Sequence, residues 1–100
     1  MPLFALIGRD GPRAAELRRR HRPAHLEALR PLVRAGRVRF AGPLLAAGAP
    51  VGSLVVFEAE GLEAARALAA RDPYVVHGVF ASHELRETRD VLPELTGDRA

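Results

Sequence analysis

The spacing of hydrophobic positions along the chain predicts a mixed α+β domain. Residues 2–8 are apolar at almost every position, which is typical of a central strand covered on both faces. Gly11-Pro12 then opens a helical stretch to about Ala35, with an apolar stripe that recurs every three or four residues. Pro23 predicts a kink or break near residues 19–23, and Gly36 predicts the C-terminal stop. The stripe consists of Leu17, His21, His25, Leu29 and Leu32.

The second half of the chain predicts three more strands and one more helix. A turn of five small residues at 46–50 would join two of these strands as a hairpin. The residue before Pro73 is driven out of the helical region, so the second helix ends there. The strands are expected at Val38–Leu45, Ser53–Ala59 and about Gly78–Thr88, and the helix at Gly61–Ala70 with Leu62, Ala65, Leu68 and Ala69 facing the core.

The resulting order, β-α-β-β-α-β, predicts a ferredoxin-like α+β fold with an antiparallel sheet and both helices on one face. We expect one domain over residues 1–100, with a core at about 2–90 and a loosely held tail at 91–100. The strand at 53–59 is apolar on both faces, and two helices cover only one of them. The other face needs a partner, which predicts a homodimer with its sheets face to face.

Composition and charge exclude several classes of protein. The chain has no cysteine, which rules out disulfides, thiolate catalysis and cysteine-ligated metals. No apolar run reaches the ~18 residues of a membrane span and no signal sequence is recognisable, so we expect a soluble, cytoplasmic protein. All 15 basic residues are arginine, so a net charge of only +3 gives a calculated pI near 10.9. The run at residues 18–22 lacks interleaved aromatics, which predicts a solvated helix face rather than nucleic-acid binding.

The residue that stands out is His25, an imidazole on the buried face of a helix. Such a ring needs a hydrogen-bond partner, and a core histidine bonded to a backbone carbonyl is the more frequent case. The alternative is acid–base chemistry, with Asp72 brought alongside from the helix–strand junction. Asp72 itself is equally a turn former before proline. Arg22 suits an anionic substrate, and Ser53 at a strand start has a hydroxyl to donate.

A metal site has little support in the sequence. His21 and His25 are four residues apart and share a helix face, but the Glu of a His-Glu-x-x-His motif is missing. A third ligand from His77, His83 or Asp72 would be required. No glycine-rich nucleotide loop and no nucleophile elbow is present, so we expect neither metal nor cofactor.

Four motifs in the same order resemble the YciI (YCII-related) family over about residues 3–90. They are Arg22-Pro23-Ala24-His25-Leu26, Gly36-Arg37-Val38 with Ala41-Gly42-Pro43, Gly52-Ser53, and Asp72-Pro73-Tyr74. The resemblance implies a ferredoxin-like subunit that pairs into a dimeric α+β barrel. It also implies an active-site dyad at His25 and Asp72. A related group resembles muconolactone-type dehalogenases and isomerases, in which such a pair handles a proton next to a carbonyl.

The sequence therefore favours a small acid–base lyase or isomerase acting on a carbonyl or lactone compound. His25 would take the proton and Asp72 would orient its ring, while a pocket formed by Arg22, Gly42, Pro43, Ser53 and Tyr74 would bind the substrate. The alternative is a non-catalytic accessory module whose pocket binds a small anionic metabolite.

Overall fold

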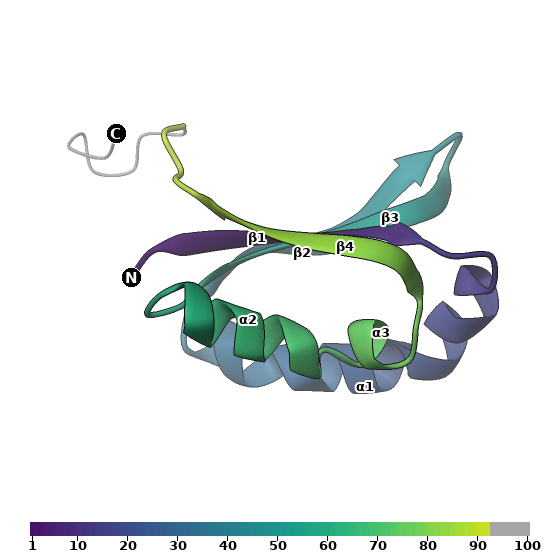
Figure 1. Cartoon of the computed structure of the whole chain (residues 1–100), viewed down its shortest axis with the longest axis horizontal. Coiled ribbons are helices and arrows are strands. Elements are labelled where there is room, and N and C mark those ends of the chain that lie inside the picture. The colour runs from purple at the N-terminus through teal and green to yellow at the C-terminus, as the bar shows by residue number, and fades with distance from the viewer. Residues whose placement is uncertain (93–100) are drawn as a thin grey trace.

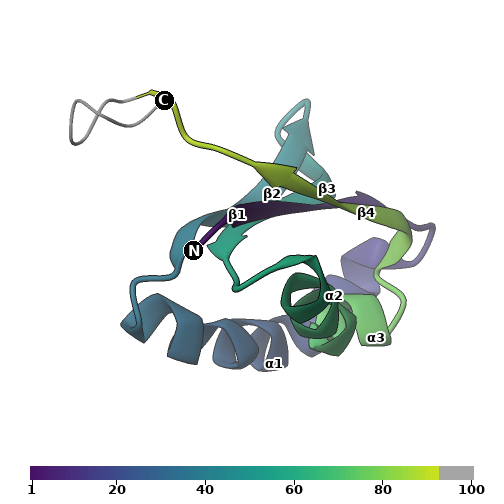
Figure 2. The same cartoon turned by 60° about the vertical axis from the view of Figure 1, so that its left-hand side comes forward.

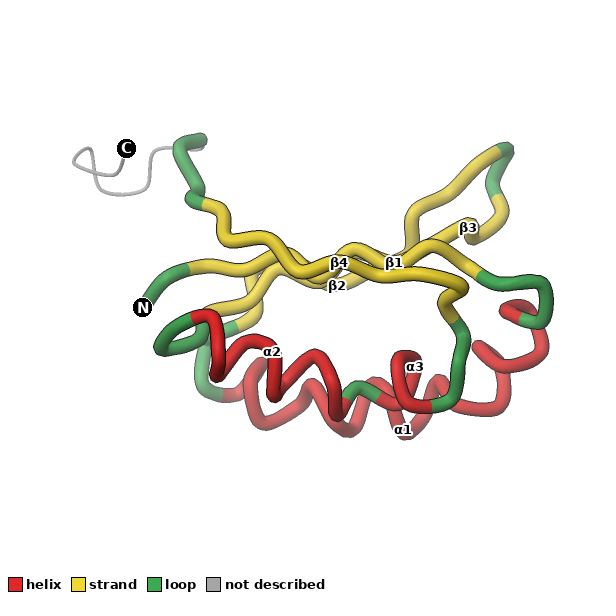
Figure 3. Tube along the Cα trace, viewed as in Figure 1, coloured by secondary structure: helices red, strands yellow, loops and turns green. Residues whose placement is uncertain are grey.

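The chain folds as a four-stranded antiparallel sheet with three helices on one of its faces (Figure 1), in a computed structural model that describes residues 1–92. The strand order is β2-β3-β1-β4, which confirms the ferredoxin-like α+β prediction. Figure 3 shows the sheet as one layer and the helices as a second. In chain order the elements are β1 (Leu3–Asp10), α1 (Ala14–Arg34), β2 (Val38–Ala46), β3 (Ala49–Glu58), α2 (Leu62–Arg71), α3 (Pro73–Val76) and β4 (Phe80–Thr88).

The core lies between the sheet and the helices. β1 is central and pairs antiparallel with both β3 and β4, so that Leu6 stands opposite Val55 on one side and Leu85 on the other. Alternate residues of β1 and β3 point into this layer because side chains of a strand alternate between its faces. The buried cluster comprises Phe4, Leu6, Val55, Phe57, Ala59, Ala65 and Ala69.

α1 is one uninterrupted helix of 21 residues that carries Pro23 and Pro31 inside it. Of the two outcomes expected at Pro23, a kink or a break, the break does not occur. The helix continues through Pro23, and His25, two residues further on, is buried. The helix stops as predicted at Gly36, whose φ of +71° suits glycine. The Gly36 and Arg37 amides donate back into the last turn, at 3.0 and 2.8 Å.

The β2–β3 hairpin is tighter than predicted. β2 continues to Ala46 and β3 begins at Ala49, so the turn is Ala47-Gly48 and not five residues. Both turn residues have positive φ, 50° and 80°, as a two-residue hairpin turn of the primed type requires. Ala-Gly is a weak signal for such a turn, which is why the prediction was wrong. The hairpin tip curls away from the helices (Figure 2).

Several other boundaries differ from the prediction. β1 runs two residues further, to Asp10, and α1 begins only at Ala14. The segment expected to be irregular after Asp72 contains the short helix α3. Leu62, the first residue of α2, was expected in the core but is 43% exposed, whereas Ala65, three residues later, is fully buried. The predicted loose tail at 91–100 falls mostly on residues 93–100, outside the described residues.

Within residues 1–92, no helix combines the length and the apolar character needed to cross a membrane.

Candidate active site

His25 and Asp72 meet in the interior although 47 residues separate them. His25 lies on the inner face of α1, and Asp72 lies at the junction of α2 and α3. The His25 Nδ1 and Asp72 Oδ1 atoms are 2.8 Å apart, and the two residues are only 8% and 7% exposed. A carboxylate only accepts hydrogen bonds, so Nδ1 donates in this contact, and in the neutral ring Nε2 carries the lone pair. The imidazole is thus bound to a carboxylate and not to a backbone carbonyl.

Asp72 performs its turn-forming role at the same time. Its Oδ1 atom accepts a hydrogen bond of 2.9 Å from the Tyr74 amide, and this bond caps α3. Pro73 occupies the first position of that helix, where no amide is needed. The sequence offered two roles for Asp72, a turn former and a partner for His25. Both contacts are present, and both are made by the same oxygen atom.

Tyr74 extends the same group of side chains. Its ring stacks on the imidazole of His25, with centroids 3.9 Å apart and planes 3° from parallel. The phenol oxygen lies 3.5 Å from the Arg18 carbonyl, to which it donates a long hydrogen bond. Tyr74 is buried, and this burial raises the pKa of its phenol above the ordinary value. The phenol therefore stays neutral at physiological pH and remains a donor.

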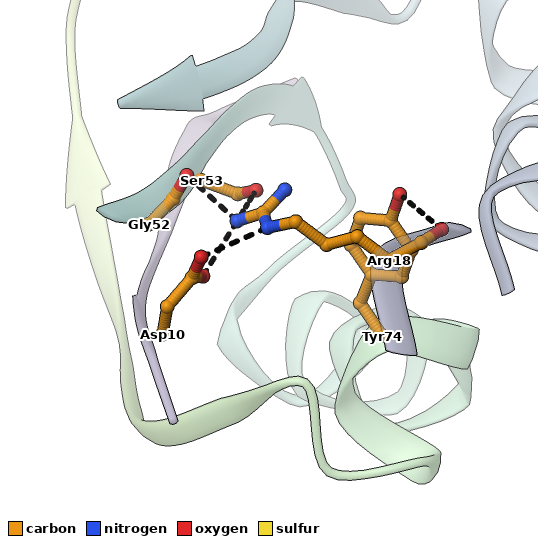
Figure 4. A network of polar contacts seen from close by, with 5 residues as sticks. All are labelled: Asp10, Arg18, Gly52, Ser53 and Tyr74. Atoms are coloured by element: carbon orange, nitrogen blue, oxygen red, sulfur yellow. Dashed lines mark hydrogen bonds and ion pairs between the residues drawn. The ribbon is translucent and has the colours of Figure 1, made fainter. Parts of the chain in front are cut away.

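Arg18 is anchored beside this cluster by a network of polar contacts (Figure 4). Its Nε and Nη2 atoms donate to the two carboxylate oxygens of Asp10, at 2.9 and 2.6 Å. Nη2 also donates to the Gly52 carbonyl at 2.8 Å and to the Ser53 hydroxyl at 3.0 Å. Arg18 belongs to the arginine run that was predicted to be a solvated helix face. For Arg18 that prediction is wrong, because the Arg18 and Asp10 side chains are only 13% and 10% exposed.

These groups line a pocket of about 330 Å³ between α1, the β2–β3 strands and Tyr74. Its size is near the lower end of the ~300 to 1,000 Å³ usual for small-molecule sites. The structure brings every residue predicted to bind substrate to this wall, together with His25. The other predicted catalytic residue, Asp72, does not line the pocket but contacts His25, which does. The predicted lining residues found there are Arg22, Gly42, Pro43, Ser53 and Tyr74.

A second cavity, of about 350 Å³, lies between the helices and the sheet. Its wall includes Asp72 and Arg71, and the rest is apolar, with Leu6, Leu29 and Phe57 among the lining side chains. Val55 borders both this cavity and the pocket. The His25–Asp72 pair thus connects the walls of the two spaces, because His25 lines the pocket and Asp72 lines the cavity.

The histidines expected as alternative metal ligands are not gathered around one point. The His21 ring stacks on the His77 ring, with centroids 3.8 Å apart and planes 1° from parallel, while His25 bonds to Asp72. Among residues 1–92, no three His, Cys, Asp or Glu side chains lie close enough together to hold a metal ion.

Sequence reasoning missed Asp10 and Arg18. A signal was available for Arg18, because it precedes His25 by seven residues, which is two helical turns and hence the same face of α1. Ala14, which precedes Arg18 by four residues, is also buried, so this face of α1 turns inward. No local pattern marks Asp10, whose partner is reached only across the end of β1.

Comparison with known proteins connects this geometry to a family. The chain is 41% identical over 97 residues to proteins named YciI from Escherichia coli O6:H1 and Shigella flexneri. The alignment covers 90% of this chain and 99% of each relative. An uncharacterized protein from Haemophilus influenzae is 37% identical over 86 residues, covering 78% of this chain and 87% of the relative.

A solved structure shares the fold closely. The 5-chloro-2-hydroxyhydroquinone dehydrochlorinase TftG from Burkholderia phenoliruptrix AC1100, in complex with 2,5-dihydroxybenzoquinone, superposes with a TM-score of 0.78 at 28% identity. The match covers 87% of this chain and 93% of that one. The sequence profile of the YCII-related domain matches residues 2–89. The chain therefore belongs to the YCII-related domain family, as its motifs predicted.

Proposed function

We propose that this protein is an acid–base enzyme of the lyase or isomerase type, acting on a small carbonyl or lactone compound. The observation that carries the proposal is the 2.8 Å contact of His25 Nδ1 with Asp72 Oδ1 at the wall of a pocket. An imidazole held this way presents a basic Nε2, and the carboxylate stabilises the imidazolium formed when the ring takes a proton.

The reaction class follows from what one such base can do. Nε2 removes a proton from the carbon next to the carbonyl, and the C–H electron pair moves onto the carbonyl oxygen as an enolate. In a lyase the electrons return to expel a leaving group from the neighbouring carbon. In an isomerase the imidazolium returns the proton to a different carbon. General acid–base catalysis of this kind supplies about 10² to 10⁴ in rate.

The structural neighbour supports the lyase variant. TftG is a dehydrochlorinase, and loss of hydrogen chloride is a proton removal coupled to departure of chloride. This chain shares that fold, and the wall of its pocket includes a histidine that is bonded to a carboxylate. Chlorinated hydroxyhydroquinones and chlorinated lactones are therefore the first compounds to assay.

The test is turnover of this panel by the wild type and by His25→Ala, followed as chloride release and as exchange of substrate protons for deuterium in D₂O. We expect both signals in the wild type and a loss of about 10² to 10⁴ in His25→Ala. His83→Ala is the matched control, because His83 is exposed on β4 and does not line the pocket. Ligand binding with neither exchange nor chloride release on any compound would instead favour a non-catalytic binding module.

We also propose that the protein is a homodimer that pairs through the bare face of the sheet. All three helices lie on the opposite face (Figure 1). The bare face carries Ile7 opposite Leu54 and Ala5 opposite Val56, and Phe40 beside them is 51% exposed. Light scattering should give twice the chain mass for the wild type and a shift toward monomer for Val56→Arg. A wild-type monomer at micromolar concentration would refute the dimer.

The absence of cysteine agrees with a reducing compartment, and we propose that the protein is cytoplasmic.

A further inference from the structure

The guanidinium of Arg18 is held in a fixed position with one nitrogen unused. Nε and Nη2 make four hydrogen bonds, to Asp10, Gly52 and Ser53. Nη1 makes none among the described residues, and Figure 4 shows it on the side of the guanidinium away from Asp10, with no dashed line. A guanidinium that is only 13% exposed and has two free N–H groups beside a pocket is pre-ordered to bind an acceptor.

Ser53 adds a second donor at the same place. Its hydroxyl oxygen accepts from Arg18 Nη2, so the hydroxyl hydrogen remains available to a ligand. Ser53 is 5% exposed and lines the pocket with Arg18 and His25. The two donors are thus fixed relative to each other at the wall of the pocket that His25 also lines.

The charge of the pocket points to the same class of ligand. Arg18, Arg19 and Arg22 line it, and none of the aspartates or glutamates among residues 1–92 does. Asp10 compensates the charge of Arg18 through its contacts with Nε and Nη2. The excess positive charge at the pocket is therefore that of Arg19 and Arg22. A small anion is therefore favoured over a neutral or cationic molecule.

From these contacts we propose that Arg18 Nη1 and the Ser53 hydroxyl form an oxyanion subsite, which binds a carboxylate or enolate oxygen of the ligand. The proposal rests on the proposed function in taking the pocket beside His25 as the ligand site. It deepens that function, because an oxygen held there receives the electron pair when His25 takes a proton from the adjacent carbon. Arg18 is then a binding residue for the charge that develops, and its substrate is an anion or becomes one.

The experiment compares benzoate and benzamide, which have nearly the same planar shape and differ in charge, by titration monitored with NMR. The wild type should bind benzoate about tenfold or more tightly than benzamide. The paired variant Asp10→Asn/Arg18→Gln removes both charges without leaving one of them buried alone, and should reduce this preference about tenfold. Ser53→Ala should weaken benzoate more than benzamide, and it keeps the test valid if the paired variant does not fold.

Asp10→Asn alone separates binding from a structural role. It leaves Arg18 with an uncompensated charge, so benzoate should bind more tightly while benzamide stays unchanged. A purely structural ion pair would instead weaken both ligands. Glu16→Gln is the matched control, since Glu16 lies on the same helix as Arg18 outside the pocket and its loss raises the net charge by one, as Asp10→Asn does.

Equal binding of benzoate and benzamide by the wild type would overturn the proposal, as would an unchanged preference in the paired and Ser53→Ala variants. The subsite and the enzyme can fail separately. A benzoate preference without turnover of any compound supports the subsite and refutes the enzyme. Turnover without a benzoate preference supports the enzyme and refutes the subsite.

Discussion

The imidazole of His25 lies parallel to the phenol ring of Tyr74 at 3.9 Å, and both residues bond to the same oxygen of Asp72. His25 does so through its ring and Tyr74 through its backbone amide. One carboxylate thus fixes the position of the proposed base and of the ring stacked on it. The geometry of the candidate site depends on three residues that cannot move independently.

Removing the Asp72 carboxylate should release His25 and uncap α3 together. We expect Asp72→Ala to lower the free energy of unfolding by about 2 kcal/mol, the sum of one buried hydrogen bond and one helix cap. Asp72→Asn keeps an acceptor for the Tyr74 amide and should lose less. Nitrogen NMR of the His25 ring should show a proton on Nδ1 in the wild type and a mixture of tautomers in Asp72→Ala. Identical ring spectra would contradict the assigned contact.

Alkaline pH should destabilise the protein through Tyr74. Because burial raises its pKa in the fold, the folded protein holds the phenol proton more tightly than the unfolded chain. Stability is then full below the ordinary value of 10.0 and falls as pH rises above it. Tyr74 is the only tyrosine, and the chain has no lysine or cysteine to titrate nearby. Phenolate absorbance should give a midpoint above 10.0, and Tyr74→Phe should abolish the alkaline decline. A midpoint at or below 10.0 would contradict the burial effect.

Mild acid should weaken the contact between His21 and His77. Partial burial lowers the pKa of His21 below its ordinary value of 6.5, and the neighbouring His77 and Arg20 add to this effect. The unfolded chain therefore binds this proton more readily, and stability declines as pH falls below 6.5. Thermal unfolding across this range should show the decline in the wild type and a flatter profile in His21→Gln. His83→Gln is the control, and its profile should match the wild type.

Gly52 should not tolerate a side chain. A Cβ atom there would lie 2.3 Å from the Gly8 carbonyl oxygen, which belongs to the central strand and has no room to retreat. We expect Gly52→Ala to cost more than about 2 kcal/mol, as overpacking against backbone does. Gly61→Ala is the comparison, because a Cβ there meets nothing within 4 Å, and it should change stability by less than about 1 kcal/mol. Chemical denaturation measures both, and equal losses would refute the steric argument.

The Arg18–Asp10 pair should be far more important for stability than the surface pairs. Truncating Arg18 to methionine leaves a nearly buried carboxylate unpaired, which typically costs about 3 to 5 kcal/mol. The double variant Arg18→Met/Asp10→Leu should recover most of that loss. Arg30→Met breaks the exposed pair with Glu27 and should cost less than about 1 kcal/mol. A loss for Arg18→Met as small as that for Arg30→Met would show that Asp10 is solvated.

The element order, the strand faces and the end of α1 at Gly36 were predictable because each depends on local chemistry. Periodicity fixes which residues turn inward, and a glycine at positive φ ends a helix wherever it occurs. The turn at Ala47-Gly48 and the short helix at 73–76 were missed. Ala-Gly is a weak signal for a hairpin turn, and Asp72-Pro73 predicted the end of the preceding helix, although the same pair also begins α3.

The residues of the candidate site likewise fall into those that the sequence predicted and those that it did not. Its predicted lining residues reached one pocket because the family motifs mark them, whereas periodicity alone left His25 ambiguous. Arg18 and Asp10 escaped because their pairing crosses from α1 to the end of β1. A charge run read along the chain cannot distinguish an arginine in solvent from one buried against a carboxylate.

The cap on α3 gives the proposed dyad an observable of its own. The hydrogen that the Tyr74 amide donates to Asp72 exchanges with solvent only when that bond opens. The same opening removes one of the two hydrogen bonds that Asp72 Oδ1 accepts, and the other is the bond from His25. Deuterium uptake at this one backbone position therefore reports how often Asp72 loses the backbone bond that holds it beside His25, in the resting protein and without any substrate.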